Sequence, residues 1–182
     1  RPDVGALDVA VIGLSGRYPL SRDIEAFWRN LRDGVDCITE VPQERWDWHA
    51  HYSEDRGRPG RHTCKWGGFI DDVDKFDPLF FNISPSAAEY MDPQERLFLE
   101  CVYAAIEHPR YTRASHATGA EPAPVGVYVG VMSEEYQLYG TQDQAKGRLV
   151  ALSGMSSAVA NRVSYFCNFS GPSLAVNTMC SS

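Results

Sequence analysis

Three apolar runs, separated from one another by helical patterns, constrain the fold of this chain more than any other feature. They read VAVIGL at 9–14, VGVYVGVM at 125–132 and SLAVNTM at 173–179. The first two are continuous and rich in β-branched residues, which is typical of strands buried on both faces of a parallel sheet. Strands that alternate with helices predict an α/β fold with a mainly parallel sheet.

Helical patterns fill the intervals between these runs. Apolar residues at helical spacing over 24–31 predict an amphipathic helix that Gly34 ends. Asp92 is expected to cap a helix over 93–107, with Glu95 at the third position of a capping box. Two further helices are expected, one beginning at Ser84-Pro85 and one from Ser153 to about 161–165.

Charge and apolar content exclude two classes of partner. The formal net charge is −7, which argues against nucleic acid as the main ligand. No run approaches the roughly 18 apolar residues that a membrane span needs, and the N-terminus has no signal-peptide pattern. We therefore expect a cytoplasmic protein. Its one dense basic run holds Arg56, Arg58, Arg61 and Lys65.

Most residues that could carry chemistry have an ordinary explanation. His49, His51, His62 and Cys64 are suitable zinc ligands, but their short, irregular spacing favours solvated loop side chains, and no metal is predicted. The paired acids at 71–72 and 134–135 are typical of solvated turns. The chain has five cysteines and no CxxC pair, which favours reduced thiols.

Cys180 is the strongest candidate for a catalytic residue. It follows an apolar strand in the sequence Thr178-Met179-Cys180-Ser181-Ser182. A cysteine at the first turn of a following helix is stabilised as a thiolate by backbone N–H groups, which can also hold an oxyanion. Ligands gather at the carboxyl ends of strands in α/β sheets. A buried cysteine acting as a small hydrophobe is the alternative that the pattern leaves open.

Five blocks in order resemble a known family, and together they cover nearly the whole chain. They are VAVIGLSGRYP, FWRNLRDGVDCITEVPQERWD, KWGGFIDDVDKFDPLFFNISPSAAEYMDPQERLFLE, VGVYVGV and ANRVSYFCNFSGPSLAVNTMCSS. The chain resembles the N-terminal half of a β-ketoacyl synthase (ketosynthase) domain from a modular polyketide synthase. The family motif Asp-Thr-Ala-Cys-Ser-Ser maps onto residues 177–182, so Cys180 corresponds to the acyl-accepting cysteine. Asn177 departs from the usual aspartate, and Met179 resembles synthases whose acyltransferase acts in trans.

The resemblance implies a thiolase-like fold, with α/β/α/β/α layers in the complete domain, and a homodimer within a multidomain synthase. Residues 1–7 are expected to be a linker. Residues 8–182 would be the N-terminal part of the ketosynthase, truncated just after the nucleophile cysteine. This part alone is expected to be inactive, since the family's two histidines and supporting lysine lie beyond the cysteine. All five histidines here precede Cys180.

The implied reaction uses acyl carrier protein domains as partners and needs neither metal nor redox cofactor, since phosphopantetheine on those carriers holds the substrates. An acyl chain is transferred to Cys180 and then condensed with a decarboxylating malonyl extender. The basic run over 56–65 is either part of a carrier docking face or a solvated loop. Two other functions stay open: a non-elongating ketosynthase that only transfers acyl chains, and a non-catalytic dimerisation or scaffold segment.

Overall fold

The computed structural model describes residues 8–112, 115, 123–150 and 154–182, which form two compact units. The smaller unit spans 15–72. The larger combines the described residues of 1–14 with those of 73–182. The predicted linker over 1–7, residues 113–114 and 116–122, and the expected helix start at Ser153 lie outside the described residues.

The smaller unit contains one helix and a two-stranded antiparallel sheet. Helix α1 (Ile24–Asp33) begins where the Asp23 side chain accepts a hydrogen bond from the Ala26 N–H at 2.7 Å. It ends at Gly34, whose φ of 65° suits a residue without a β-carbon. This confirms the predicted helix. Strands β1 (Thr39–Glu40) and β2 (Trp66–Gly67) enclose a long loop with a short 3₁₀ helix, η1 (Trp48–Ala50).

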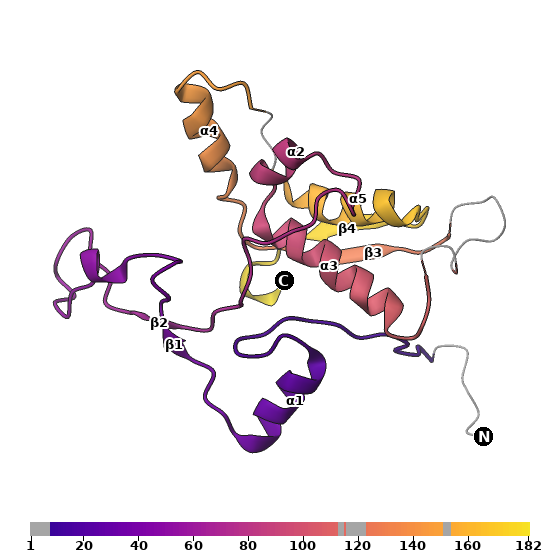
Figure 1. Cartoon of the computed structure of the whole chain (residues 1–182), viewed down its shortest axis with the longest axis horizontal. Coiled ribbons are helices and arrows are strands. Elements are labelled where there is room, and N and C mark those ends of the chain that lie inside the picture. Colours follow the sequence, from indigo (N-terminus) through magenta and orange to yellow (C-terminus); the bar gives the residue numbers. More distant parts are fainter. Residues whose placement is uncertain (1–7, 113–114, 116–122, 151–153) are drawn as a thin grey trace. The chain divides into compact units, whose positions relative to one another are not determined.

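The larger unit is built on two parallel strands and four helices (Figure 1). Strands β3 (Val127–Gly130) and β4 (Ser173–Val176) pair in parallel, with Val127 opposite Ser173. The helices are α2 (Pro85–Tyr90), α3 (Pro93–Glu107), α4 (Gln137–Ala145) and α5 (Ser156–Cys167). A 3₁₀ turn, η3 (Met179–Ser181), follows β4. The predicted helix over 93–107 is confirmed at both ends.

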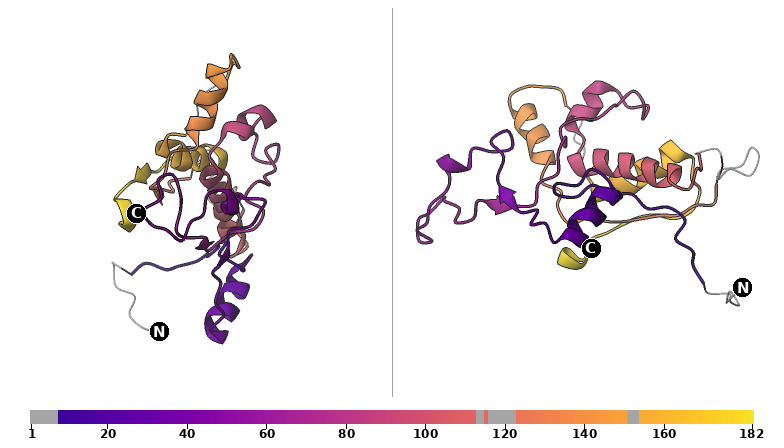
Figure 2. Two further views of the ribbon diagram at one scale, coloured as in Figure 1. Left: turned by 90° about the vertical axis from the view of Figure 1, so that its left-hand side faces the viewer. Right: turned by 60° about the horizontal axis from the view of Figure 1, so that its bottom comes forward.

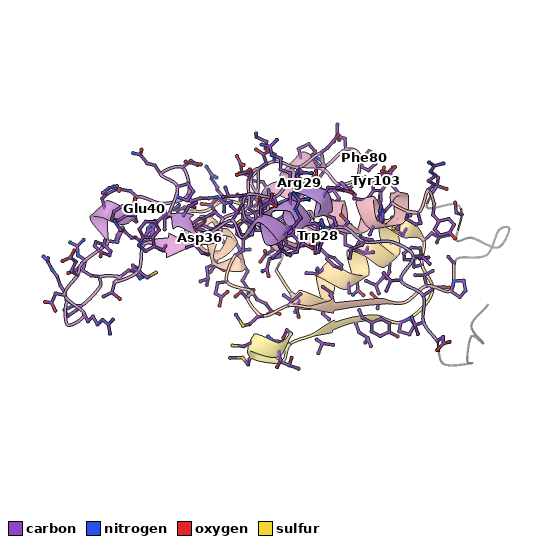
Figure 3. All side chains as sticks on the ribbon, turned by 90° about the horizontal axis from the view of Figure 1, so that it is seen from below. Trp28, Arg29, Asp36, Glu40, Phe80 and Tyr103 are labelled. Carbon is purple, nitrogen blue, oxygen red and sulfur yellow. The ribbon has the colours of Figure 1, made fainter. Side chains whose placement is uncertain are left out.

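The core of the larger unit lies between the sheet and helices α3 and α5. Alternate residues of β3 and the segment after it, Val127, Val129 and Val131, are buried toward these helices. Leu99 of α3 and Val163 of α5 are almost fully buried, and each contributes about 1.5–3 kcal/mol of hydrophobic free energy. At the edge of this core Phe80 and Tyr103 meet edge to face, with ring centroids 4.9 Å apart (Figure 3).

The other face of the sheet is exposed, which corrects the expectation that the 125–132 run is a strand buried on both faces. Tyr128 is 64% exposed, and Leu174 and Val176 are about half exposed. Helix α5 packs on the opposite face, and α3 packs on α5. The strands are also shorter than the apolar runs, and β4 ends at Val176.

The first apolar run does not form a strand, so the prediction for 9–14 is wrong for this structure. Val9 and Val11 are 92% and 84% exposed. A strand needs a neighbouring backbone to complete its hydrogen-bond ladder, and none of the described residues supplies one. In its place, the N–H of Leu14 donates to Nδ1 of His108, just after α3.

Helix α4, which the sequence patterns did not predict, is held through polar contacts at its C-terminal end. Both views in Figure 2 show it extending away from α3 and α5. The Tyr90 hydroxyl of α2 donates to the Asp143 carboxylate at 3.0 Å, and Lys146 and Arg148 also contact this group. The hydrogen bond from Tyr90, together with the two cations, lowers the pKa of Asp143.

Glu95 does not close a capping box, which corrects a second local expectation. Asp92 caps α3 by accepting from the Gln94 N–H at 2.8 Å, but the fully buried Glu95 carboxylate instead accepts from Nε of Arg162 on α5. The ion pair gives the carboxylate a countercharge in a water-excluded position and ties α3 to α5. None of the described helices is long and apolar enough to cross a bilayer.

We predict that removing Arg162 destabilises the larger unit far more than removing the pair. Arg162→Met leaves the buried Glu95 carboxylate uncompensated, and the free energy of unfolding should fall by about 3–5 kcal/mol. The double variant Glu95→Leu/Arg162→Met should recover most of that loss, because no charge then remains buried. Urea unfolding followed by circular dichroism measures both. Equal losses in the single and double variants would contradict the ion-pair explanation.

Candidate active site

Cys180 lies in a tight turn at the carboxyl end of β4, as the sequence pattern indicates. The backbone leaves the strand at Val176 and turns through η3 (Figure 1). Met179, directly before Cys180, has a φ of +60°, a conformation that residues with a β-carbon adopt at a cost in energy. The Cys180 side chain is exposed, so the alternative of a buried structural cysteine does not hold in this structure.

Hydrogen bonds within the turn hold this backbone in place. The Asn177 Oδ1 accepts from the Met179 N–H at 3.1 Å, and the Ser182 N–H donates to the Met179 carbonyl at 3.1 Å. The Ser181 hydroxyl donates to the Thr178 carbonyl at 3.0 Å. Short polar side chains at these positions suit the turn because each reaches the backbone of a residue within three positions.

The N–H of Cys180 differs from its neighbours in the turn. The N–H groups of Met179, Ser181 and Ser182 each donate to an oxygen within the turn. Within the residues that the structure describes, the N–H of Cys180 has no acceptor. A thiol and an available N–H on the same residue can together attack a carbonyl carbon and bind the oxygen that becomes negative.

The end of β3 lies beside this turn. The Val131 N–H donates to the Val176 carbonyl at 3.1 Å, and Asn177 Nδ2 donates to the Met132 carbonyl at 3.4 Å. A β-carbon at Gly130 would lie 2.5 Å from the carbonyl carbon of Ser182, so only glycine permits this approach.

The histidines and Cys64 of the long loop make structural contacts in the smaller unit. His51 stacks on Trp46, and His62 meets the same ring edge to face. His49 stacks on Trp48, while the Cys64 thiol donates to the Trp66 carbonyl. Across the described part of the chain, no three His, Cys, Asp or Glu side chains are grouped so as to hold a metal ion.

The basic run divides into engaged and exposed side chains. Lys65 pairs with Glu40 at 2.6 Å and lies over the Trp48 ring, and Arg61 donates to the Ala50 carbonyl. Both therefore stabilise the loop. Arg56 and Arg58 are exposed, and the described residues give neither side chain an ion-pair partner.

Sequence analysis did not predict two features of the site region. The two hydrogen bonds of the Asn177 amide have no sequence pattern of their own, although the asparagine in place of the family's aspartate draws attention to this residue. Glu95 had a local explanation as a capping residue, so its long-range partner Arg162 was missed. The paired acid Glu134 also has a structural role, because it accepts from the Ser156 N–H at the start of α5.

Comparison with known proteins identifies the family to which this geometry belongs. The model of the β-ketoacyl synthase N-terminal domain matches residues 6–182. The chain is 58% identical over 179 residues to polyketide synthase PksL of Bacillus subtilis strain 168, covering 96% of this chain and 4% of that protein. It is 57% identical over 181 residues to polyketide synthase ThaG of Burkholderia thailandensis, covering 100% of this chain and 3% of that protein.

Solved ketosynthases share the structure. The oxazolomycin ketosynthase domain OzmH KS7 of Streptomyces albus JA3453 superimposes with a TM-score of 0.87 at 47% identity, covering 94% of this chain and 29% of that one. The ketosynthase from module 6 of the bacillaene synthase of Bacillus subtilis 168 gives 0.76 at 38% identity, covering 95% and 27%. The chain thus spans less than a third of the length of these solved ketosynthases. It belongs to the β-ketoacyl synthase family, as the N-terminal part of a ketosynthase domain of the modular polyketide synthase type.

Proposed function

We propose that Cys180 is the acyl-accepting nucleophile of a ketosynthase that elongates polyketide chains. The observation that carries the proposal is the exposed Cys180 thiol at the carboxyl end of β4, with the N–H of the same residue available. Its place in the motif over 177–182 and the similarity to ketosynthases support the same role. Met179 before the nucleophile supports the subtype whose acyltransferase acts in trans.

The first half-reaction is a transfer between thioesters. The Cys180 thiolate attacks the carbonyl carbon of an acyl group carried on the phosphopantetheine of a carrier protein. A tetrahedral intermediate forms, and its oxyanion accepts a hydrogen bond from the Cys180 N–H. The carbon–sulfur bond to pantetheine breaks, the pantetheine thiolate takes up a proton, and the acyl group remains on Cys180.

The second half-reaction forms the new carbon–carbon bond. A malonyl group on a second carrier loses carbon dioxide, and the resulting carbanion attacks the Cys180 thioester. The bond to sulfur breaks, which frees the Cys180 thiolate and leaves a β-ketoacyl chain on the carrier. Because the described chain covers less than a third of solved ketosynthases, we propose that residues beyond it supply the groups for decarboxylation, within a thiolase-like homodimer.

Cys180→Ala should abolish acyl loading in the intact protein that carries these residues. Intact-mass spectrometry before and after incubation with an acyl-pantetheine thioester should show one added acyl group, absent from the variant. Cys64→Ala is the matched control, since Cys64 is also an exposed cysteine and should leave loading unchanged. Loading that persists in Cys180→Ala would refute the proposed nucleophile.

The same protein distinguishes elongation from simple transfer. Adding a malonyl-loaded carrier to acylated protein should give a β-ketoacyl chain on the carrier, longer by two carbons than the loaded acyl group, with one carbon dioxide lost per condensation. Loading without condensation would support the non-elongating alternative. Neither loading nor condensation would support a scaffold role.

We further propose that Arg56 and Arg58 contact the acyl carrier protein. Carrier proteins are acidic, and complementary charge accelerates association. Since Arg61 and Lys65 already hold the loop through Ala50 and Glu40, the two exposed arginines are the members of the basic run best suited to a partner.

Arg56→Glu/Arg58→Glu should slow loading from an acyl carrier protein by about tenfold at low salt, because the charge that attracts the carrier is reversed. Loading from a small acyl-pantetheine thioester should not change. Arg29→Glu, at an exposed position of α1, is the matched charge reversal and should have little effect (Figure 3). An unchanged rate from the carrier at low ionic strength would exclude docking at this loop.

A further inference from the structure

We propose that Asn177 is a positioning residue for acyl transfer, because its side-chain amide fastens the Cys180 turn to the end of β3. One end of the amide holds the backbone before the nucleophile, and the other end holds the neighbouring strand. The inference rests on the proposed role of Cys180 and adds the residue that sets the orientation of its N–H and thiol.

The oxygen of the amide acts on the backbone next to the nucleophile. Asn177 Oδ1 accepts from the Met179 N–H at 3.1 Å. Met179 has the positive φ that turns the chain, so this bond favours an otherwise costly conformation. The φ and ψ angles of Met179 determine where the peptide N–H of Cys180 points. Loss of this bond therefore changes the direction of the one N–H in the turn that remains available for an oxyanion.

The nitrogen of the amide acts on a fixed point of the sheet. Asn177 Nδ2 donates to the Met132 carbonyl at 3.4 Å. The residues on either side of Met132 are themselves held: the Val131 N–H bonds to the Val176 carbonyl, and Gln94 Nε2 donates to the Ser133 carbonyl at 2.8 Å. The turn is thus connected through Asn177 to β3 and, through Ser133, to the first turn of α3.

The chemistry of the amide explains why both connections occur together. An amide offers an acceptor and a donor, whereas a carboxylate offers acceptors alone. The aspartate typical of the family motif can receive the Met179 N–H, but it has no N–H for the Met132 carbonyl. The acceptor is therefore the part of the amide that orients Cys180, and the donor adds a second connection, to the end of β3.

The test compares Asn177→Leu and Asn177→Asp in the intact protein. Leucine has a similar size and no polar atom, so acyl loading from an acyl-pantetheine thioester should fall about tenfold, equivalent to about 1.4 kcal/mol of transition-state stabilisation. Aspartate keeps the acceptor, so its loading rate should return to within about threefold of the unchanged protein. Asn161→Leu, at an exposed position of α5, is the matched control and should load normally.

Alkylation of Cys180 by iodoacetamide separates positioning from simple exposure or folding. This displacement forms no oxyanion, so its rate should be equal in the leucine variant and the unchanged protein, as should the melting temperature. Normal loading in Asn177→Leu would overturn the inference, and so would parallel losses of loading, alkylation and melting temperature without rescue by aspartate. If the unchanged protein fails to load, the proposed role of Cys180 fails first, and the inference with it.

Discussion

The parallel pairing of β3 with β4 is the constraint on which the rest of the larger unit depends. Parallel strands have their carboxyl ends at the same edge, so the residues that follow each strand meet there. The Val131–Val176 hydrogen bond continues this pairing beyond the strands themselves. The register thereby places Met132 within reach of Asn177 and brings Gly130 against Ser182, and both contacts hold the turn that contains Cys180.

The helices make this edge rigid from one side. Helix α5 packs on both strands, and α3 packs on α5, with the Glu95–Arg162 pair at their contact. Since Asp92 and Gln94 open α3, the position of the helix also determines where the Ser133 carbonyl is held. The first turn of α3 therefore supplies both Glu95, which pairs with Arg162 of α5, and Gln94, which holds the Ser133 carbonyl. The packing of α3 on α5 thus also affects the geometry of the turn that contains Cys180.

Sequence reasoning predicted the elements with strong local signals and missed those that depend on distant partners. Helices α1 and α3 have caps and apolar periodicity within their own residues, and both were predicted correctly. The run over 9–14 is as apolar as a strand, but a strand also needs a neighbouring backbone, which composition does not reveal. Glu95 fitted a capping box locally, and only the tertiary fold shows its partner. Cys180 was predicted as a candidate nucleophile because a motif surrounds it, whereas the two hydrogen bonds of Asn177 follow from the strand register.

The exposed face of the β3–β4 sheet has a consequence for handling the molecule. Tyr128, Leu174 and Val176 form an apolar surface on two strands whose outer edges have no strand partner among the described residues. Such surfaces lead to intermolecular strand pairing and precipitation when they meet water in a crowded solution. A preparation limited to residues 8–182 would therefore be prone to aggregation. Low protein concentration, or a solubilising fusion partner, would be needed to keep such a fragment dispersed.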